Sequence, residues 1–191
     1  GARFAYLKGP LVRLQMALVA LALDTLEEAG FTPVIPPVLV REEAMWGTGF
    51  FPTDRSSIYR TADDDLFLVG TSEVPLAGLH GDTILAEDDL PLRYGGVSTC
   101  FRREAGAWMP AQERYREVTS CSNCTDYQAR RLKCRVKRGK ATEAVHTLNG
   151  TAVAVGRSII AILENHQRED GSVAIPAALQ AKGAPAEIVP R

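Results

Sequence analysis

The longest regular hydrophobic pattern in the chain covers Leu11–Ala29 and has the period of an α-helix. Apolar residues fill most of the circumference, and one face carries Leu11, Leu14, Leu18 and Leu21. Pro10 suits the first turn of a helix, and Gly30 suits the left-handed residue that follows many last turns. We therefore expect a helix over Leu11–Ala29 that is buried on more than one side.

Shorter patterns along the rest of the chain have the period of a strand. Phe31–Val40 contains three prolines within a β-branched run, which excludes a central strand and fits an edge strand. Alternation of side chains predicts another strand over Glu113–Ser122. Further strands are expected at Leu66–Val69, Leu92–Phe101, Lys133–Val136, Ala141–Val145 and Ser172–Ile175, and one more ends near Asn149 and Gly150.

Helical patterns separate these strands. Short helices are expected within Glu42–Ile58, at Val74–Leu79 and at Thr125–Leu132, and a longer helix at about Ala152–His166. The tail from Pro176 is rich in alanine and proline, and we expect it to be loosely packed.

Composition bounds the class of protein. With 191 residues, 46% of them apolar and 24% charged, the chain can form one globular domain with a real core. The net charge of −1 gives no overall basic field, although Arg130–Lys140 contains seven Lys or Arg. No apolar run is long enough to cross a bilayer, and the first residues do not resemble a signal peptide. We expect a cytoplasmic protein without membrane contact.

The cysteines leave two interpretations open. Cys121 and Cys124 have the spacing of half a zinc site or of a redox pair. Cys100 and Cys134 are single, and neither supplies the second half of such a site at metal-ligand spacing. We favour a strand-to-loop segment with buried thiols over a zinc site.

A group of charged residues ends one predicted strand. Val97–Ala107 runs from a β-rich stretch into Arg102, Arg103 and Glu104, and then into Ala-Gly-Ala. A guanidinium fits a carboxylate or a phosphate with two hydrogen bonds. On a strand, Arg102 and Glu104 share one face and Arg103 takes the other. The pair could hold an anion and accept from an exocyclic amine; a solvated strand end is the alternative.

Val97–Ala107 resembles the second signature motif of class II aminoacyl-tRNA synthetases, in the form found in seryl-tRNA synthetases. Other stretches match the same family in the family's order, and they are Gly30–Arg41, Gly70–Val74, Arg116–Cys124 and Thr147–Glu164. The resemblance covers nearly the whole chain. It implies an α+β fold, an antiparallel sheet flanked by helices. The chain has neither a Gly-x-Gly-x-x-Gly nor a phosphate-loop lysine motif.

The resemblance implies serine–tRNA ligase activity, with serine, ATP and tRNA(Ser) as substrates. The residues implied to bind serine are Thr71, Ser72, Glu73, Arg102, Asn149 and Thr151, with Glu73 at the ammonium group. The residues implied to bind ATP are Arg102, Arg103, Glu104, Glu117, Val118, Thr119, Ser120 and Arg157. Arg102 is implied to act at the α-phosphate and the serine carboxylate, and Arg157 at the γ-phosphate, both as catalytic residues.

The resemblance also implies a metal ion and a homodimer. Glu117 and Ser120 are implied to hold Mg²⁺ or Mn²⁺ between ATP phosphates. These two residues do not share a face of an ideal strand, so we expect a bulge or a strand end near Thr119. The dimer interface is implied at the helix and strand of about residues 11–40. The basic turn Lys137–Lys140 could touch an RNA backbone or be a solvated turn.

The resemblance breaks between Ala107 and Trp108. Members of the family continue from the second motif into a flexible loop and a second antiparallel strand, so several dozen residues are missing here. The family's N-terminal tRNA-binding arm has no counterpart within residues 1–191. We expect residues 1–191 to form a single, incomplete catalytic domain. Two alternatives stay open: a truncated synthetase-like protein that binds nucleotide or a partner without full aminoacylation, and an enzyme that activates an amino acid for a carrier protein.

Overall fold

The computed structural model describes residues 5–103 and 117–190. Its longest element is α1 (Pro10–Glu28), which starts at the proline and is followed by Gly30 in a left-handed conformation. The expected helix and its glycine are thus confirmed. Burial falls on one face, at Leu14, Ala17 and Leu18, whereas Met16 is 56% exposed. The expected burial on more than one side is therefore not reached within one chain.

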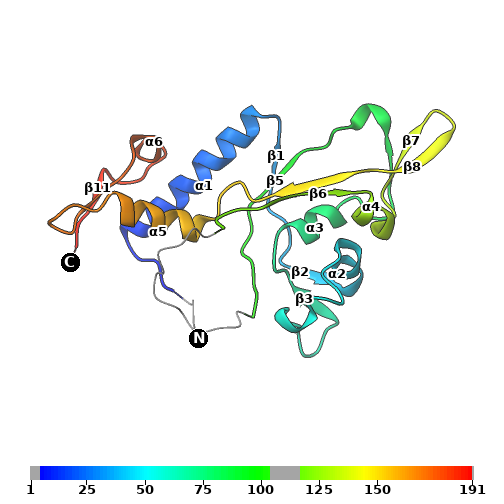
Figure 1. Ribbon diagram of the computed structural model, residues 1–191, viewed down its shortest axis with the longest axis horizontal. Coiled ribbons are helices and arrows are strands. Elements are labelled where there is room, and N and C mark those ends of the chain that lie inside the picture. Colours follow the sequence, from blue (N-terminus) through cyan, green and yellow to red (C-terminus); the bar gives the residue numbers. More distant parts are fainter. Residues whose placement is uncertain (1–4, 104–116, 191) are drawn as a thin grey trace.

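The buried face of α1 forms a core with the C-terminal third of the chain (Figure 1). It packs against α5 (Val155–Asn165) and α6 (Ala177–Gln180), and β10 (Val173–Ala174) pairs antiparallel with β11 (Glu187–Ile188) beside them. The residues that fill this core are Leu14, Ala17, Leu18, Ile159, Val173, Ile175, Leu179 and Ala184. The prediction of a loose tail was wrong, because Leu179 and Ala184 of the tail are buried in this core.

A second core lies under the strand pair β2 (Leu39–Arg41) and β3 (Leu66–Leu68), which is antiparallel. Helices α2 (Glu42–Thr48) and α3 (Glu73–Gly78) pack on each other there, and η1 (Arg55–Ser57) follows α2. The buried residues are Val40, Met45, Phe51, Ile58, Phe67, Val69 and Val74.

Two predicted strands are shorter than expected. The edge strand expected over Phe31–Val40 divides into β1 (Thr32–Val34) and β2, since Pro36 and Pro37 interrupt the run. β1 pairs in parallel with β5 (Tyr94–Gly96), and the chain from Val97 to Phe101 is irregular. The strand predicted to lead into Arg102 was therefore wrong after Gly96.

The remaining elements surround a long antiparallel pair, β6 (Cys121–Thr125) with β9 (Thr147–Gly150). Helix α4 (Tyr127–Leu132) follows β6, and a sheet of order β4-β7-β8 joins β4 (Ile84–Ala86) to the hairpin of β7 (Arg135–Arg138) and β8 (Ala141–Ala144). η2 (Glu87–Asp89) lies beside β7. The hairpin prediction is confirmed, and the hairpin projects from one end of the molecule (Figure 1). The strand predicted over Glu113–Ser122 is wrong at residues 117–120, since β6 begins at Cys121.

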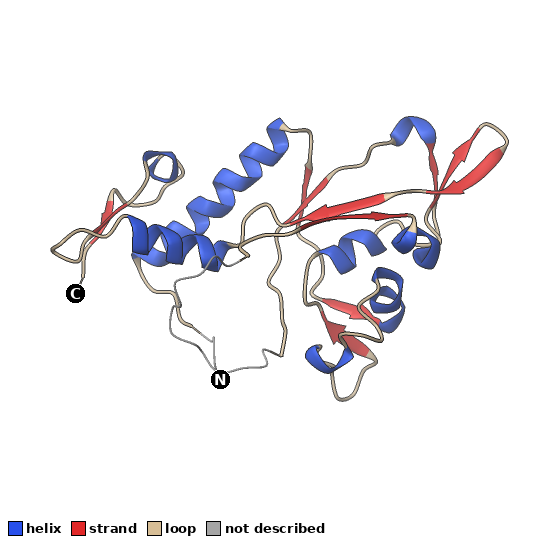
Figure 2. Ribbon diagram, in the orientation of Figure 1, coloured by secondary structure: helices blue, strands red, loops and turns tan. Residues whose placement is uncertain are grey.

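The described strands form several small sheets between helices, and most of their pairings are antiparallel (Figure 2). Two pairings, β1 with β5 and β4 with β7, are parallel. Strand pairs β1–β5 and β6–β9 run through the middle of the molecule, between the α1 core and the β2–β3 core (Figure 1). Across residues 5–103 and 117–190, no helix combines the length and the apolar character required to cross a membrane.

Candidate functional site

The site begins at the corner between β3 and α3. The chain leaves β3 through Gly70, Thr71 and Ser72, and Glu73 is the first residue of α3. The Glu73 backbone N–H donates a 3.3 Å hydrogen bond to Thr71 Oγ1, whereas the Ser72 side chain makes no capping bond. Thr71 therefore holds the turn that directs Glu73 into the interior.

Two side-chain amides converge on the Glu73 carboxylate. Gln128 Nε2 donates to Glu73 Oε1 at 2.6 Å, and Asn149 Nδ2 donates to the same oxygen at 2.7 Å. Gln128 lies on α4 and is only 3% exposed; its own Oε1 accepts a 2.8 Å bond from Thr147 Oγ1. Within the described residues Glu73 Oε2 accepts no hydrogen bond, so one carboxylate oxygen stays available to a ligand.

Burial raises the pKa of Glu73 above its ordinary value of 4.5, and the Gln128 hydrogen bond and the Arg102 charge act in the opposite direction. The same surroundings raise the pKa of the Cys124 thiol, first through burial and then through the Glu73 charge. Asn149 Nδ2 also lies 3.3 Å from Cys124 Sγ. Both shifts disfavour the charged form of the group, and the Cys124 thiol therefore stays protonated at neutral pH.

These groups line a cavity of about 220 Å³. Its walls come from α2, α3, α4 and the pair β6–β9, in which Ser122 lies opposite Asn149. The lining residues are Thr48, Gly49, Phe50, Asp54, Glu73, Ser122, Cys124, Tyr127, Gln128 and Asn149. A small polar ligand with a cationic group fits a cavity of this volume and charge.

Arg102 and Arg103 diverge, as the sequence predicted. Arg102 Nε donates a 3.1 Å hydrogen bond to the Gly70 carbonyl oxygen, at the same corner that positions Glu73. The Arg103 guanidinium stacks over the Tyr59 ring at 5.2 Å, and its backbone N–H bonds to Ser57. Glu104 lies outside the described residues. Arg102 is thus the arginine next to the cavity.

A second group of predicted residues lies along residues 117–120. Arg157, in the first turn of α5, donates to the Glu117 carbonyl oxygen, and the Thr151 N–H donates to the Ser120 carbonyl oxygen at 3.1 Å. Glu117, Val118, Thr119 and Ser120 are all exposed. The structure brings Arg157 and Thr151 to this segment, and neither is among the residues that line the cavity.

Residues 117–120 are compatible with a hard cation. On an ideal strand the side chains of Glu117 and Ser120 would lie on opposite faces. Residues 117–120 form no strand, so this geometry does not separate the two side chains. Carboxylate and hydroxyl oxygens are suitable donors for Mg²⁺, which keeps water or phosphate as its other ligands. Among the described residues, no cluster of three His, Cys, Asp or Glu could hold a metal by itself.

The cysteines form no zinc site in the described part of the chain. Cys134 is buried, Cys124 is half-buried, and Cys100 and Cys121 are exposed. The interpretation of Cys121–Cys124 as a segment with buried thiols is therefore wrong for Cys121 and holds only in part for Cys124.

Sequence reasoning missed Gln128, Cys124 and Tyr127 as residues of the cavity. α4 has six residues, too few for its periodicity to reveal a polar residue on the buried face. The only available signal was an uncharged polar residue, Gln128, beside Ala129 in a short helix that also carries two arginines.

Comparison with known proteins finds relatives that match most of this chain. Residues 105–166 match the family described as tRNA synthetase class II core domain (G, H, P, S and T). The chain is 39% identical over 252 residues to a serine–tRNA ligase of Streptomyces coelicolor, covering 94% of this chain and 59% of the relative. It is 40% identical to a serine–tRNA ligase of Arthrobacter sp. (strain FB24), covering 100% of this chain and 63% of the relative.

A solved structure agrees with this result. The seryl-tRNA synthetase of Pyrococcus horikoshii complexed with ATP matches with a TM-score of 0.93 and 37% identity, over 100% of this chain and 59% of that one. The expected α+β class II fold is thus confirmed. The chain spans about three fifths of the length of these relatives. The Arthrobacter alignment runs over 268 positions and the chain has 191 residues, so at least 77 positions have no counterpart here.

Proposed function

We propose, because the chain is a homologue of the serine–tRNA ligases, that it activates serine with ATP and transfers the seryl group to tRNA(Ser). The observation that carries this proposal is the Glu73 carboxylate, held by two amides at the wall of a cavity of about 220 Å³. An amino acid as small as serine suits this volume. Its ammonium group would donate to Glu73 Oε2.

The other residues assigned to serine surround the same corner. Thr71 and Ser72 precede Glu73, Arg102 bonds to Gly70, and Asn149 reaches Glu73 from β9. Arg102 would hold the serine carboxylate and the α-phosphate together, since a guanidinium can bind two oxygens at once. Thr151 follows β9 and would approach the substrate from that side.

The proposed reaction needs little acid–base chemistry. A serine carboxylate oxygen attacks the α-phosphorus of ATP, the bond to the bridging oxygen breaks, and pyrophosphate leaves while seryl-adenylate remains. The carboxylate is already ionised, so no base is required. Catalysis consists of positioning and charge neutralisation, in which Arg102 serves the α-phosphate and Arg157 the γ-phosphate.

The remaining assignments for ATP concern Arg103, Glu104 and residues 117–120. Glu104, outside the described residues, would accept from the adenine amino group. Glu117 and Ser120 would hold Mg²⁺ or Mn²⁺, which supplies positive charge to the phosphates when bound. Exposure of Glu117–Ser120 supports access for a large nucleotide.

We also propose a homodimer through about residues 11–40, which the resemblance of this helix and strand to the family's first motif implies. The exposed apolar side chains Met16, Ile35 and Leu39, from α1 and the segment that follows it, support such an interface. We also propose that the protein acts in the cytoplasm.

We further propose that residues 1–191 form one catalytic domain, and that a segment present in the relatives is missing between residues 107 and 108. The alignment with the Arthrobacter relative has at least 77 positions more than this chain has residues, which supports a missing segment. The intact mass of the protein isolated from its source tests this. A mass near 20.7 kDa supports the deletion, and a substantially larger mass contradicts it.

Serine-dependent exchange of pyrophosphate into ATP tests the first step, and transfer of labelled serine to tRNA tests the second. Exchange with serine but not with threonine or alanine is the expected result. Absence of exchange in a folded protein would contradict serine activation. The missing segment favours one second candidate, a synthetase-like protein that binds nucleotide without full aminoacylation. Transfer to a carrier protein in place of tRNA would instead identify an amino-acid-activating enzyme.

A further inference from the structure

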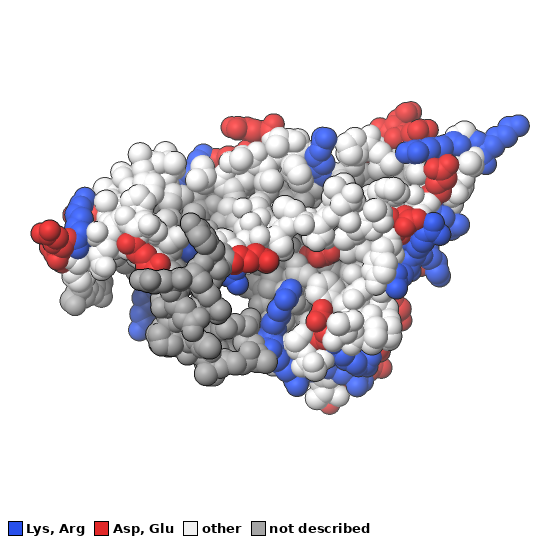
Figure 3. All heavy atoms as spheres, in the orientation of Figure 1, with Lys and Arg blue, Asp and Glu red and all other residues white. Residues whose placement is uncertain are grey.

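The charge of residues 130–140 differs from that of the rest of the chain. This segment has seven basic and no acidic residues, so the remainder has 15 basic and 23 acidic residues. The basic residues are Arg130, Arg131, Lys133, Arg135, Lys137, Arg138 and Lys140. The fold keeps them together on α4, β7 and the turn to β8, and Figure 3 shows Lys and Arg atoms at this end of the molecule with some Asp and Glu atoms among them.

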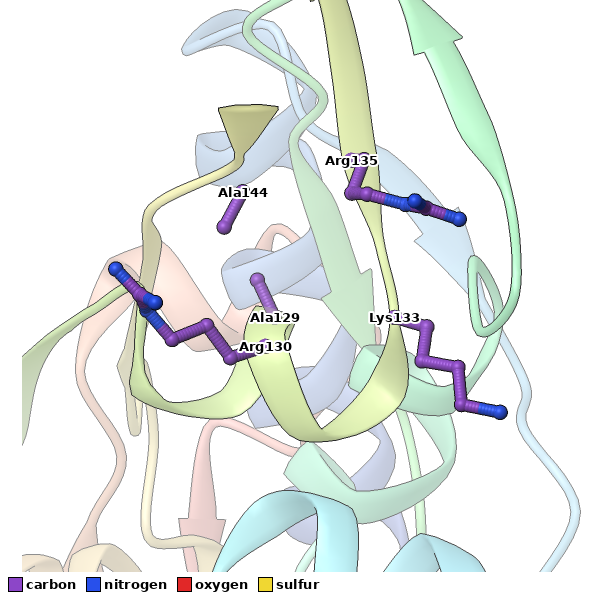
Figure 4. Close-up of a pocket in the computed structure, with 5 residues that line it drawn as sticks. All are labelled: Ala129, Arg130, Lys133, Arg135 and Ala144. Carbon is purple, nitrogen blue, oxygen red and sulfur yellow. The ribbon is translucent and has the colours of Figure 1, made fainter. Parts of the chain in front are cut away.

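Part of this segment borders a groove of about 450 Å³, lined by Ala129, Arg130, Lys133, Arg135 and Ala144, which we call the α4–β7 groove. In Figure 4 the two alanines lie between the cations, with Arg130 on one side and Lys133 and Arg135 on the other. The three cationic side chains are exposed and do not converge on one point. The groove therefore has small apolar residues inside and positive charge along both borders.

The cations of the groove have only weak internal partners. Arg130 pairs with Asp126 at 2.5 Å, and Lys133 lies 3.5 Å from Asp82. Exposed pairs of this kind contribute little and are readily exchanged for another anion. Arg135 makes no ion pair within residues 5–103 and 117–190. Lys137 and Lys140, beyond it on the hairpin, likewise pair with no described residue.

We propose that the α4–β7 groove binds the phosphodiester backbone of RNA. Cations on two borders suit a row of phosphates better than one compact anion, and arginine can bind a phosphate with two hydrogen bonds. The alanine interior offers no side-chain donor or acceptor to a base edge. Recognition would therefore depend on the backbone and not on the sequence.

The position of the groove relates it to the proposed reaction, on which this part of the inference rests. α4 supplies Arg130 to the groove, and it supplies Tyr127 and Gln128 to the cavity around Glu73. The helix has six residues, about 9 Å at the usual rise. On the same helix the Arg131 guanidinium stacks on the ring of Tyr127, 3.7 Å from its centre. An RNA in the groove would lie within one short helix of the amino-acid cavity.

The test measures binding of fluorescently labelled tRNAs of different sequence over a series of salt concentrations. The variants are Lys133→Gln, Arg135→Gln and the two combined; Lys8→Gln is the matched control, since Lys8 is exposed and precedes α1, whose start lies far from the hairpin (Figure 1). Each groove substitution is expected to lower the slope of log K against log salt by about 1, equally for every tRNA. Lys8→Gln is expected to bind like the wild type.

Three outcomes would overturn the proposal. The first is an unchanged slope of log K against log salt in the double variant. The second is a loss of binding confined to one tRNA sequence, and the third is a loss of binding no larger than in Lys8→Gln. Polyglutamate that competes with equal strength, and loses binding in the same variants, would assign the groove to an acidic polypeptide instead. Serine-dependent pyrophosphate exchange is measured in parallel and should be unchanged in all variants. A wild-type protein that binds tRNA but shows no pyrophosphate exchange would contradict the proposed function and leave the proposal for the groove standing.

Discussion

Gln128 Nε2 donates a 2.6 Å hydrogen bond to Glu73 Oε1, joining the buried face of α4 to the first residue of α3 across 55 positions of sequence. Gln128 is nearly fully buried and also accepts from Thr147. It therefore fixes the direction of the carboxylate that we assign to the serine ammonium group. No feature of the sequence alone indicates this relationship.

Gln128→Ala is expected to raise KM for serine more than it lowers kcat. A hydrogen bond to a charged group is worth about 1.5–3 kcal/mol, which corresponds to a factor of about 10–100. Pyrophosphate exchange at varied serine concentration measures the effect, with the exposed Gln167→Ala as the control. Partial recovery in Gln128→Asn would support positioning, and an unchanged KM in folded Gln128→Ala would contradict it.

Glu73 predicts a dependence of serine binding on pH. Burial raises its pKa above 4.5, and only the ionised carboxylate attracts the ammonium group. KM for serine should therefore rise as the pH falls through this raised pKa. Glu73→Gln should bind serine weakly at every pH and remove the dependence, whereas the exposed Glu43→Gln should keep it. The same profile in Glu73→Gln would assign the titration to another group.

The raised pKa of Glu73 also makes the free energy of unfolding depend on pH. Since the folded-state pKa lies above the unfolded value, the unfolded state releases its proton first as the pH rises. Wild-type stability should thus decline relative to Glu73→Gln between pH 4.5 and the folded-state pKa. Urea unfolding of both proteins over this pH range measures the difference in their free energies of unfolding. A wild-type protein that becomes more stable relative to Glu73→Gln as the pH rises would contradict the raised pKa.

Arg102→Ala is expected to abolish serine-dependent pyrophosphate exchange, because Arg102 is assigned to both reacting groups. Arg102→Lys keeps the charge and loses the paired donors, so it should retain only part of the activity. The exposed Arg168→Ala serves as the control, since Arg168 pairs with Glu187 in the C-terminal part of the chain. Near-normal exchange in Arg102→Ala would overturn the assignment.

The elements with long or simple patterns could be predicted from the sequence. α1, α5, the β7–β8 hairpin and the corner before Glu73 all follow local rules of periodicity, turns and caps. The motif residues Glu73 and Asn149 were also identified, and the fold brings them together. Gln128 and Cys124 could not be found, because their role depends on contacts between α4, β6 and β9 that no local pattern encodes.

Prediction failed where long-range packing decides local structure. Val97–Phe101 is rich in β-formers yet pairs after Gly96 with no strand among residues 5–103 and 117–190, so it stays irregular. The tail from Pro176 looked loose by composition, yet Leu179 and Ala184 are buried against α1. Exposure of Met16 likewise depends on whether a second chain covers α1, which a single chain cannot reveal.

The exposure of Met16 leads to a test of the proposed homodimer. At 56% exposure this residue is apolar without cover from its own chain. Met16→Asp places a charge on the proposed interface and should shift the protein from dimer to monomer in analytical ultracentrifugation. Val189→Asp changes a similarly exposed residue near the C-terminus and should leave the dimer intact. A wild-type protein that is monomeric at all concentrations would contradict the interface.

Leu179 tests whether the C-terminal tail is part of the fold. The side chain is 4% exposed and belongs to the core formed with α1 and α5. Leu179→Ala removes buried methyl groups and leaves a cavity, a change that costs about 2–5 kcal/mol in well-packed cores. The free energy of unfolding in urea should fall by this amount, whereas the same measurement on Val189→Ala, which is 59% exposed, should change by less than about 0.5 kcal/mol. Equal, small effects of both substitutions would mean that the tail packs loosely in solution, as its composition alone predicts.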